Sequence, residues 1–331
     1  MTVDTSIDVR SDFKQVIEDY LKYKRALGYK ADGRYQRCYL QLCCFLSMRY
    51  ERSLPPILTF EMVNDYIFQG DGLNKAGTIH NRMSIIRQLA LFMNLANPGN
   101  YVFPKERIIR IQKDDFTPYV FSHEEIKKLD AGFQCLRKQK LSPCKNLVFQ
   151  MLFRMLYCTG LRLSEALNLK LEDIDLDYGL LHIRKPKNNH DRQVPMSLSL
   201  WEEMKQYYSA MQFHDGHTLF LFPTAKGVNY KPGSIGKTFK QVYEACGIRT
   251  EKGSLPRIHD LRHTFCTHAL EQMIEQGTDV YCALPYLCEY VGHRDISSTN
   301  AYLRLLPEKF AGISEQLEEY CPALIPEVLY D

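Results

Sequence analysis

Apolar residues recur every three or four positions along most of this chain, a spacing that places them on one face of an α-helix. The first hundred residues contain four such stripes: Phe13, Val16, Tyr20, Tyr23 and Leu27; Tyr35, Cys38, Leu42 and Phe45; residues 59–70; and Ile79, Met83, Ile86, Ala90 and Met93. Further helical segments follow at 123–129, 146–157, 200–211, 234–247 and 260–277. This pattern predicts a mainly helical protein.

Strand signals are confined to short segments in the second half of the chain. LLHIRK at 180–185 and RQVPM at 192–196 are separated by a polar turn, which is typical of a β-hairpin. LFLF at 219–222 predicts one more short strand. We therefore expect a small antiparallel β-sheet within a helical protein.

A chain of 331 residues is too long for one ordinary domain and comfortable for two. A stretch rich in proline and mixed charge, without a sustained period, separates the two helical regions, and Ser122 and Glu125 beyond it have the spacing of a helix capping box. We predict a helical N-terminal domain at 1–105, a linker at 106–120, a second domain at 121–302 and a tail at 303–331.

The net charge of +3 hides an uneven distribution. Residues 1–110 hold sixteen Lys and Arg against eleven Asp and Glu, and the remainder holds 26 against 28. In the first part, basic residues cluster between positions 22 and 37 and also lie off the apolar face of the fourth helix. They are Lys22, Lys24, Arg25, Lys30, Arg34, Arg37, Arg82 and Arg87. A single lysine on a helix usually only solvates the surface, but the cluster at 22–37 favours a nucleic-acid-binding face.

The eleven cysteines favour reduced thiols over disulfides or zinc, because no CxxC occurs and most of them have apolar neighbours. The N-terminal residues are polar and acidic, unlike a signal peptide. The longest apolar stretch, 147–156, is interrupted by Gln150 and Arg154 and cannot span a bilayer. We expect a cytoplasmic protein.

Four local clusters in the second part contain residues suited to chemistry. They are TGLRLSE at 159–165, PKNNHDRQVP at 186–195, HDLRH at 259–263, and Gly292-His293 with Tyr302 nine residues after the histidine. Helical spacing places Glu165 beside Arg162, and Arg262 beside His259. Each cluster alone is more often structural than catalytic. Together and in this order they indicate a site.

Three segments resemble the signature boxes of the tyrosine recombinases, also called phage-type integrases. TGLRLSEALNL is similar to the first-arginine box, HDLRHTFCTHAL to the His-x-x-Arg-His box, and VGHRDISSTNAYLRL to the box that ends at the nucleophilic tyrosine. The basic N-terminal helices are similar to the family's core-binding domain, so the resemblance covers nearly the whole chain. It implies the DNA breaking–rejoining fold, mainly α with a small antiparallel sheet.

The resemblance also implies a role for each matching residue. Arg162 and Arg262 would hold the scissile phosphate, for which a planar guanidinium fork is well suited. Tyr302 would attack the phosphorus. Lys187, with Lys185 as its competitor, would protonate the leaving 5′-oxygen.

The remaining matches would assist. His259 would act as an acid/base or as a phosphate donor. His293 would be a further phosphate ligand, and Glu165 would orient its neighbours. The family needs no metal, cofactor or ATP.

The chain departs from the family between His263 and His293. The segment is several residues longer than usual and includes CALPYL, and Cys266 replaces a small residue. We expect an altered loop there and unchanged chemistry. No arm-binding domain precedes the core-binding helices, so we do not expect long-range arm sites.

The tail carries an apolar stripe, Phe310, Ile313, Leu317 and Tyr320, on an acidic segment. It would pack either against its own domain or, as the family resemblance implies, against a neighbouring protomer in a DNA-bound tetramer.

We therefore predict a site-specific DNA recombinase that works through a 3′-phosphotyrosyl intermediate and a Holliday junction and serves a mobile element. Its partners would be double-stranded DNA with paired sites, three further copies of itself and accessory directionality proteins, at the nucleoid. Alternatives are a catalytically silent DNA-binding accessory protein, a type IB topoisomerase-like enzyme, and a zinc-binding regulator that uses His182, His190 and scattered cysteines.

Overall fold

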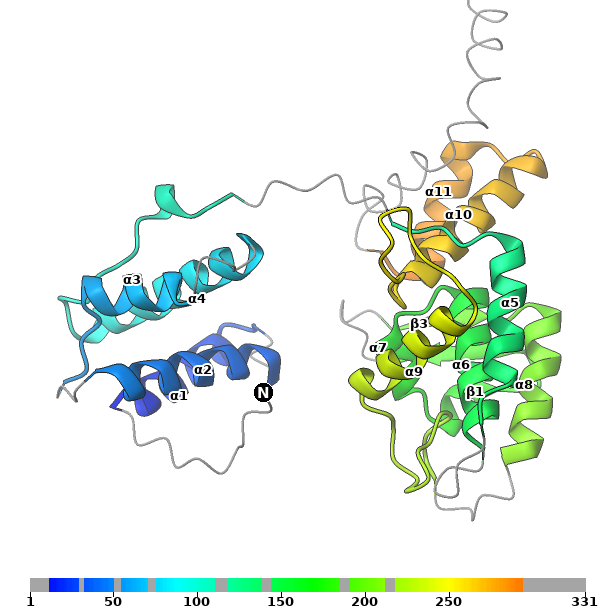
Figure 1. Cartoon of the computed structure of the whole chain (residues 1–331), viewed down its shortest axis with the longest axis horizontal. Helices are drawn as coiled ribbons and strands as arrows, with labels where there is room; N and C mark the ends of the chain where they lie inside the picture. Colours follow the sequence, from blue (N-terminus) through cyan, green and yellow to red (C-terminus); the bar gives the residue numbers. More distant parts are fainter. Residues whose placement is uncertain are drawn as a thin grey trace, which may run out of the picture. The chain divides into compact units, whose positions relative to one another are not determined.

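The computed structural model describes residues 12–29, 33–50, 55–70, 76–110, 118–137, 144–184, 191–211 and 218–293. The chain divides into two compact units, residues 1–116 and 117–331 (Figure 1), and this division falls within the predicted linker. Several predicted features lie outside the described residues: Lys30, Lys185, Lys187, His190, Tyr302, the tail 303–331, and the side chain of Arg34.

The first unit contains the four predicted helices. They are α1 (Asp12–Ala26), α2 (Gly33–Arg49), α3 (Phe60–Phe68) and α4 (Ala76–Ala96), followed by the short 3₁₀ helix η1 (Lys105–Arg107). Thr59 caps α3, since its hydroxyl accepts a hydrogen bond from the Met62 amide. The predicted positions on α2 and α4, except Cys38, lie in or against one apolar core, which also includes Met62, Val63, Tyr66 and Ile67 of α3.

The buried face of α1 includes Phe13 and Tyr20 of the predicted stripe but otherwise differs from it. The sequence stripe included Tyr23 and Leu27, but these are 41% and 54% exposed. Ile17 and Leu21, four residues apart, are buried instead. Apolar residues at both three- and four-residue spacing outline two possible faces, and packing against α2 and α4 selects one of them.

Residues that follow α4 also pack on the first unit. The Tyr101 amide donates to the Leu58 carbonyl, and the buried Asn100 side chain accepts from the Leu58 amide at 2.9 Å. Phe103 is buried in the same core. The chain therefore stays bound to this unit for several residues after its last α-helix.

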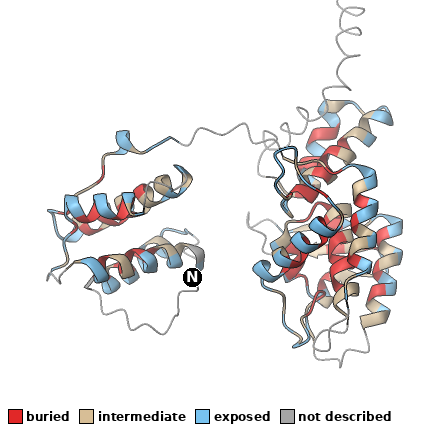
Figure 2. Cartoon of the chain, in the orientation of Figure 1, coloured by how far each residue is buried: buried red, intermediate tan, exposed pale blue. Residues whose placement is uncertain are grey.

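The second unit is built around α6. Its helices are α5 (His123–Gln134), α6 (Lys145–Thr159), α7 (Leu163–Asn168), α8 (Leu198–Met211), α9 (Pro232–Ala245), α10 (Asp260–Glu275) and α11 (Val280–Val291), with the short 3₁₀ helix η2 (Leu171–Asp173). Helix α6 contacts α5, α7, α8 and α10 and is buried along most of its length. In each unit the buried residues gather between the helices (Figure 2). The predicted capping box of Ser122 and Glu125 begins α5 and is confirmed.

A three-stranded antiparallel sheet lies beside these helices in the order β1 (Ile174–Asp175), β2 (Leu180–Ile183) and β3 (Arg192–Pro195). Strands β2 and β3 form the predicted hairpin, with Ile183 opposite Arg192. The predicted strand at 219–222 is wrong, because the segment makes only an isolated bridge between Phe220 and Lys170. Its amide and carbonyl groups pair with residues 169–171, which end in the first residue of η2 and are too few to form a ladder.

The added segment before Gly292 forms a helix, so the expectation of an altered loop is wrong. Residues 280–291 make up α11, and Asp279 caps its first turn. Ala283, Leu284 and Leu287 are buried against Cys266 and Leu270 of α10. The longer segment is therefore accommodated as an amphipathic helix, α11. Within the described segments, no helix is long and apolar enough to cross a membrane.

Candidate active site

The segment TGLRLSEALNL forms the end of α6, a short turn and α7. Helix α6 ends at Gly160, and Arg162 occupies the N-cap of α7. Arg162 Nη1 lies 2.8 Å from Glu165 Oε1, and the Arg162 amide donates to Glu165 Oε2 at 3.1 Å. The predicted pairing is confirmed, but it is not a surface ion pair: the two side chains are 20% and 3% exposed.

Arg262 lies in the first turn of α10 and is 2% exposed, as deeply buried as Asp260. Its Nη1 donates to the Gly160 carbonyl and its Nη2 to the Val291 carbonyl, both at 2.7 Å. These carbonyls end α6 and α11, where the helix dipoles favour a positive charge. Arg262 thereby joins α10 to the ends of α11 and of α6, whose carbonyl lies 102 residues away in sequence.

Two glycines make this close approach possible. Gly160 and Gly292 adopt positive φ values of 60° and 66°, which residues with a side chain rarely adopt. A Cβ on Gly160 would meet the Phe265 ring at 2.4 Å, and one on Gly292 would meet Arg192 at 2.9 Å. The Gly292 carbonyl accepts a hydrogen bond from Arg162 Nη2 at 3.0 Å. Arg162 and Arg262, the two arginines of the predicted site, are therefore linked through the backbone at the ends of α6 and α11.

Three histidines surround the arginines: His259 at the N-cap of α10, His263 one turn later, and His293 after α11. Burial, with the nearby guanidinium groups as a further cause, lowers the pKa of His259 and of His293 to about 4. Burial and then the neighbouring His259 lower the pKa of His263 to about 4, and the two rings lie 5.0 Å apart. All three imidazoles are neutral at pH 7 and can accept a proton or donate a hydrogen bond.

Arg192 belongs to this cluster, although sequence analysis assigned it no role. Its Nη2 lies 2.8 Å from Glu165 Oε2, and its Nε donates to the Tyr290 carbonyl at 3.1 Å. The sequence did contain a signal for it. Arg192 and Val194 are two residues apart on one strand and therefore face the same side of the sheet, and Val194 is fully buried. His263 was also missed, although it follows His259 by one helical turn.

The Glu165 carboxylate remains ionised despite its burial. Burial by itself raises its pKa, but hydrogen bonds from Arg192 and Arg162 outweigh burial, and the pKa lies below its usual value. One carboxylate thus holds two arginines.

The predicted DNA-binding residues of the first unit have different surroundings. Lys22 is exposed and pairs with Asp19, while Lys24 lies over the Tyr29 ring at 4.6 Å. Arg25 and Arg37 are exposed.

The two arginines of α4 are half-buried and bond backbone carbonyls. Arg82 donates to the Gln69 carbonyl at 2.8 Å, and Arg87 donates to the Phe103 carbonyl. These bonds hold the segments after α3 and α4 on the first unit. A contact of either side chain with DNA remains a prediction.

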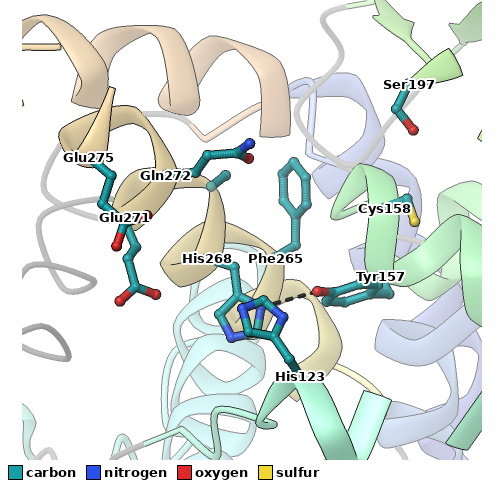
Figure 3. A pocket seen from close by; sticks show the side chains of 10 residues that line it. His123, Tyr157, Cys158, Ser197, Phe265, His268, Glu271, Gln272 and Glu275 are labelled. Carbon is teal, nitrogen blue, oxygen red and sulfur yellow. Dashed lines mark hydrogen bonds between the residues drawn. The ribbon is translucent and has the colours of Figure 1, made fainter. Parts of the chain in front are cut away.

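A separate pocket of about 670 Å³ lies between the second half of α10, the start of α5 and the end of α6. Figure 3 shows the His123 and His268 rings overlapping beside the Tyr157 hydroxyl; the ring centroids are 4.2 Å apart. His268 Nδ1 and the Tyr157 hydroxyl are hydrogen-bonded at 3.1 Å. None of the arginines of the candidate site lines this pocket.

Among the described residues, no three His, Cys, Asp or Glu side chains are placed to hold a metal ion. His182, one of the two histidines of the zinc hypothesis, lies on β2 near Gln193. The arrangement of arginines and neutral histidines instead suits an oxyanion with several acceptor atoms, such as a phosphate.

Comparisons with known proteins identify the family. Residues 120–309 match the model of the phage integrase family. The putative integrase/recombinase y4rB of Sinorhizobium fredii is 29% identical over 315 residues, covering 93% of this chain and 98% of that protein. A tyrosine recombinase of Pseudothermotoga lettingae is 29% identical over 309 residues, covering 92% and 98%.

A solved structure shares the fold. The pre-cleavage complex of the XerH site-specific recombinase bound to difH substrate has a TM-score of 0.63 at 17% identity, over 90% of this chain and 95% of that chain. The helical unit with its small sheet is thus the fold of a tyrosine recombinase catalytic domain. The chain belongs to the phage integrase family of tyrosine recombinases, as its motifs predicted.

Proposed function

We propose that this protein is a site-specific DNA recombinase that cleaves and rejoins strands through a covalent phosphotyrosine. The observation that carries the proposal is the convergence of Arg162, Arg262 and His293, which are far apart in sequence, at the adjoining ends of α6, α10 and α11. Two guanidinium groups on one phosphate would offset the charge that develops as phosphorus becomes five-coordinate.

The cleavage step needs a nucleophile, a proton acceptor and a proton donor. In the proposal, the Tyr302 oxygen forms a bond to phosphorus while the bond from phosphorus to the 5′-oxygen breaks. The tyrosine proton passes to the neutral His259, and Lys187 protonates the leaving 5′-oxygen. Rejoining reverses each transfer, so the phosphate ester energy is retained and no ATP is required.

The assembly and biological role follow from the same proposal. Four protomers would bring two DNA sites together and exchange strands through a Holliday junction, and accessory proteins would set the direction. The basic helices α1 and α2 would contact DNA phosphates. We place the activity at the nucleoid, where a mobile element and its target DNA meet.

Two successive experiments test the proposal. A plasmid that carries the DNA flanking the gene is incubated with the protein, and new junctions are sequenced to find the site. A nicked duplex of that site is then used to trap the covalent intermediate, which should form with the wild type and disappear with Tyr302→Phe. Wild type without an adduct would indicate the accessory protein, and relaxation of supercoils without paired sites would indicate a topoisomerase.

A further inference from the structure

The Arg192 side chain is engaged within the protein. It is 7% exposed and begins strand β3. Its Nε donates to the Tyr290 carbonyl, and its two terminal nitrogens lie 2.8 and 3.4 Å from the oxygens of Glu165. This fork connects the sheet to α7 and to the last turn of α11.

The backbone of Gly292 lies directly against the Arg192 guanidinium. A Cβ at Gly292 would be 2.9 Å from Nη1 and 3.0 Å from Cζ of Arg192. Gly292 in turn accepts from Arg162 and precedes His293. Arg192 therefore supports the segment that contacts one phosphate-binding arginine and carries one of the histidines.

The charge balance of Arg162, Glu165 and Arg192 gives a second reason to assign Arg192 a role. Glu165 lies between Arg162 and Arg192, so the three ionised side chains together carry one positive charge. Without Arg192, the buried carboxylate would neutralise Arg162. At a buried site with a low effective dielectric, that difference acts strongly on a bound phosphate.

We propose that Arg192 is a positioning residue that keeps the charge of Arg162 available to the scissile phosphate and holds the Gly292–His293 segment in place. The proposal rests on the proposed recombinase function. It predicts that loss of Arg192 damages charge compensation at the phosphate more than it damages the fold.

The test compares two substrates with the full-length protein. One nicked duplex has an ordinary phosphodiester at the cleavage site, and the other has a methylphosphonate, which lacks the negative charge that Arg162 would offset. Arg192→Met should slow single-turnover cleavage of the phosphodiester by on the order of 10²-fold. It should slow cleavage of the methylphosphonate far less, so the ratio of the two rates shifts.

Arg184→Met is the matched control. Arg184 directly follows the first strand of the same hairpin, β2, and pairs with the buried Asp173 at 2.8 Å, but it is itself 56% exposed. Its loss also removes an ion pair between an arginine and a buried carboxylate, and it should leave the ratio of the two rates at the wild-type value. A reduced folded fraction lowers both rates equally and cannot change this ratio.

Equal slowing on both substrates by Arg192→Met would overturn the proposal and leave Arg192 a structural residue. If that variant does not fold, Arg192→Gln removes the charge but keeps a hydrogen-bond donor for Glu165, and it should shift the ratio in the same direction. An unchanged ratio in a slowed Gln variant would also overturn the proposal. The double variant Arg192→Met/Glu165→Gln restores one positive charge and should cleave the phosphodiester faster than Arg192→Met alone. Absence of any wild-type adduct would reject the recombinase function instead.

Discussion

Single residues at the ends of helices determine how closely the site can assemble. Gly160 ends α6, presents its carbonyl to Arg262, and leaves room for the Phe265 ring. The glycine turn was visible in the sequence, but its contacts with α10 come from residues about a hundred positions away.

We expect Gly160→Ala to lower the free energy of unfolding by about 1–3 kcal/mol. The alanine would be held at positive φ and its Cβ would overlap Phe265. Urea unfolding followed by circular dichroism measures the change. Gly233→Ala is the control, since a Cβ there meets nothing within 4 Å and alanine favours the helix by up to about 1 kcal/mol. Equal losses in both variants would contradict the steric explanation.

The buried histidines predict acid sensitivity. The pKa values of His259, His263, His268 and His293 are lowered to about 4 in the folded protein from an ordinary 6.5. Between these values the unfolded chain binds more protons, so the free energy of unfolding should decrease as the pH falls from 6.5 towards 4 and should be insensitive to these groups above 7. Thermal melts across this range measure the effect.

His268→Gln separates this effect from the active site, because His268 lies in the pocket of Figure 3. The variant should lose part of the pH dependence, and its melting temperature should fall less between pH 6.5 and 4.5 than that of the wild type. An unchanged slope would show that His268 is protonated in the folded protein over this range.

At the scale of elements, periodicity predicted the long helices well because each one carries its own apolar stripe. The short elements were different. Strand β1, with two residues, has no period to detect, and LFLF failed to form a strand because its partner segment is short. Helix α11 was missed because the unusual length of the segment, with its added CALPYL element, suggested an altered loop.

Pro285 weakens α11 at an exposed position. A proline inside the helix has no N–H to donate to the Tyr281 carbonyl. Pro285→Ala should restore this bond and raise the free energy of unfolding by about 1–3 kcal/mol, as chemical denaturation would measure. Tyr286→Ala, also on the exposed face, should change stability by less than about 0.5 kcal/mol. A destabilised Pro285→Ala variant would show that the proline ring itself is required for packing.

For the whole molecule, the small net charge of +3 is unevenly distributed: the first unit is basic and the second is nearly neutral. Proposed DNA binding by the first unit should be strongly dependent on salt. Each phosphate contact contributes about −0.9 to the slope of log affinity against log salt.

The triple variant Lys22→Gln/Arg25→Gln/Arg37→Gln should bind DNA more weakly and with a shallower salt slope. Fluorescence anisotropy at several salt concentrations measures both. The control removes the same charge from exposed lysines of the second unit, Lys127, Lys128 and Lys205. An equal effect of the two triples would show that only total charge matters and that the cluster at 22–37 has no special role.

The sequence by itself determined the helical class, the hairpin, the order of the motif residues and the family, because apolar periodicity and short motifs are local properties. Only the tertiary structure decided which of these residues meet. Arg162 bonds a carbonyl 130 residues away, Arg262 bonds one 102 residues away, and Arg192 becomes a buried partner of Glu165. Such contacts depend on how whole helices pack and which charges they remove from water, and no local pattern records that outcome.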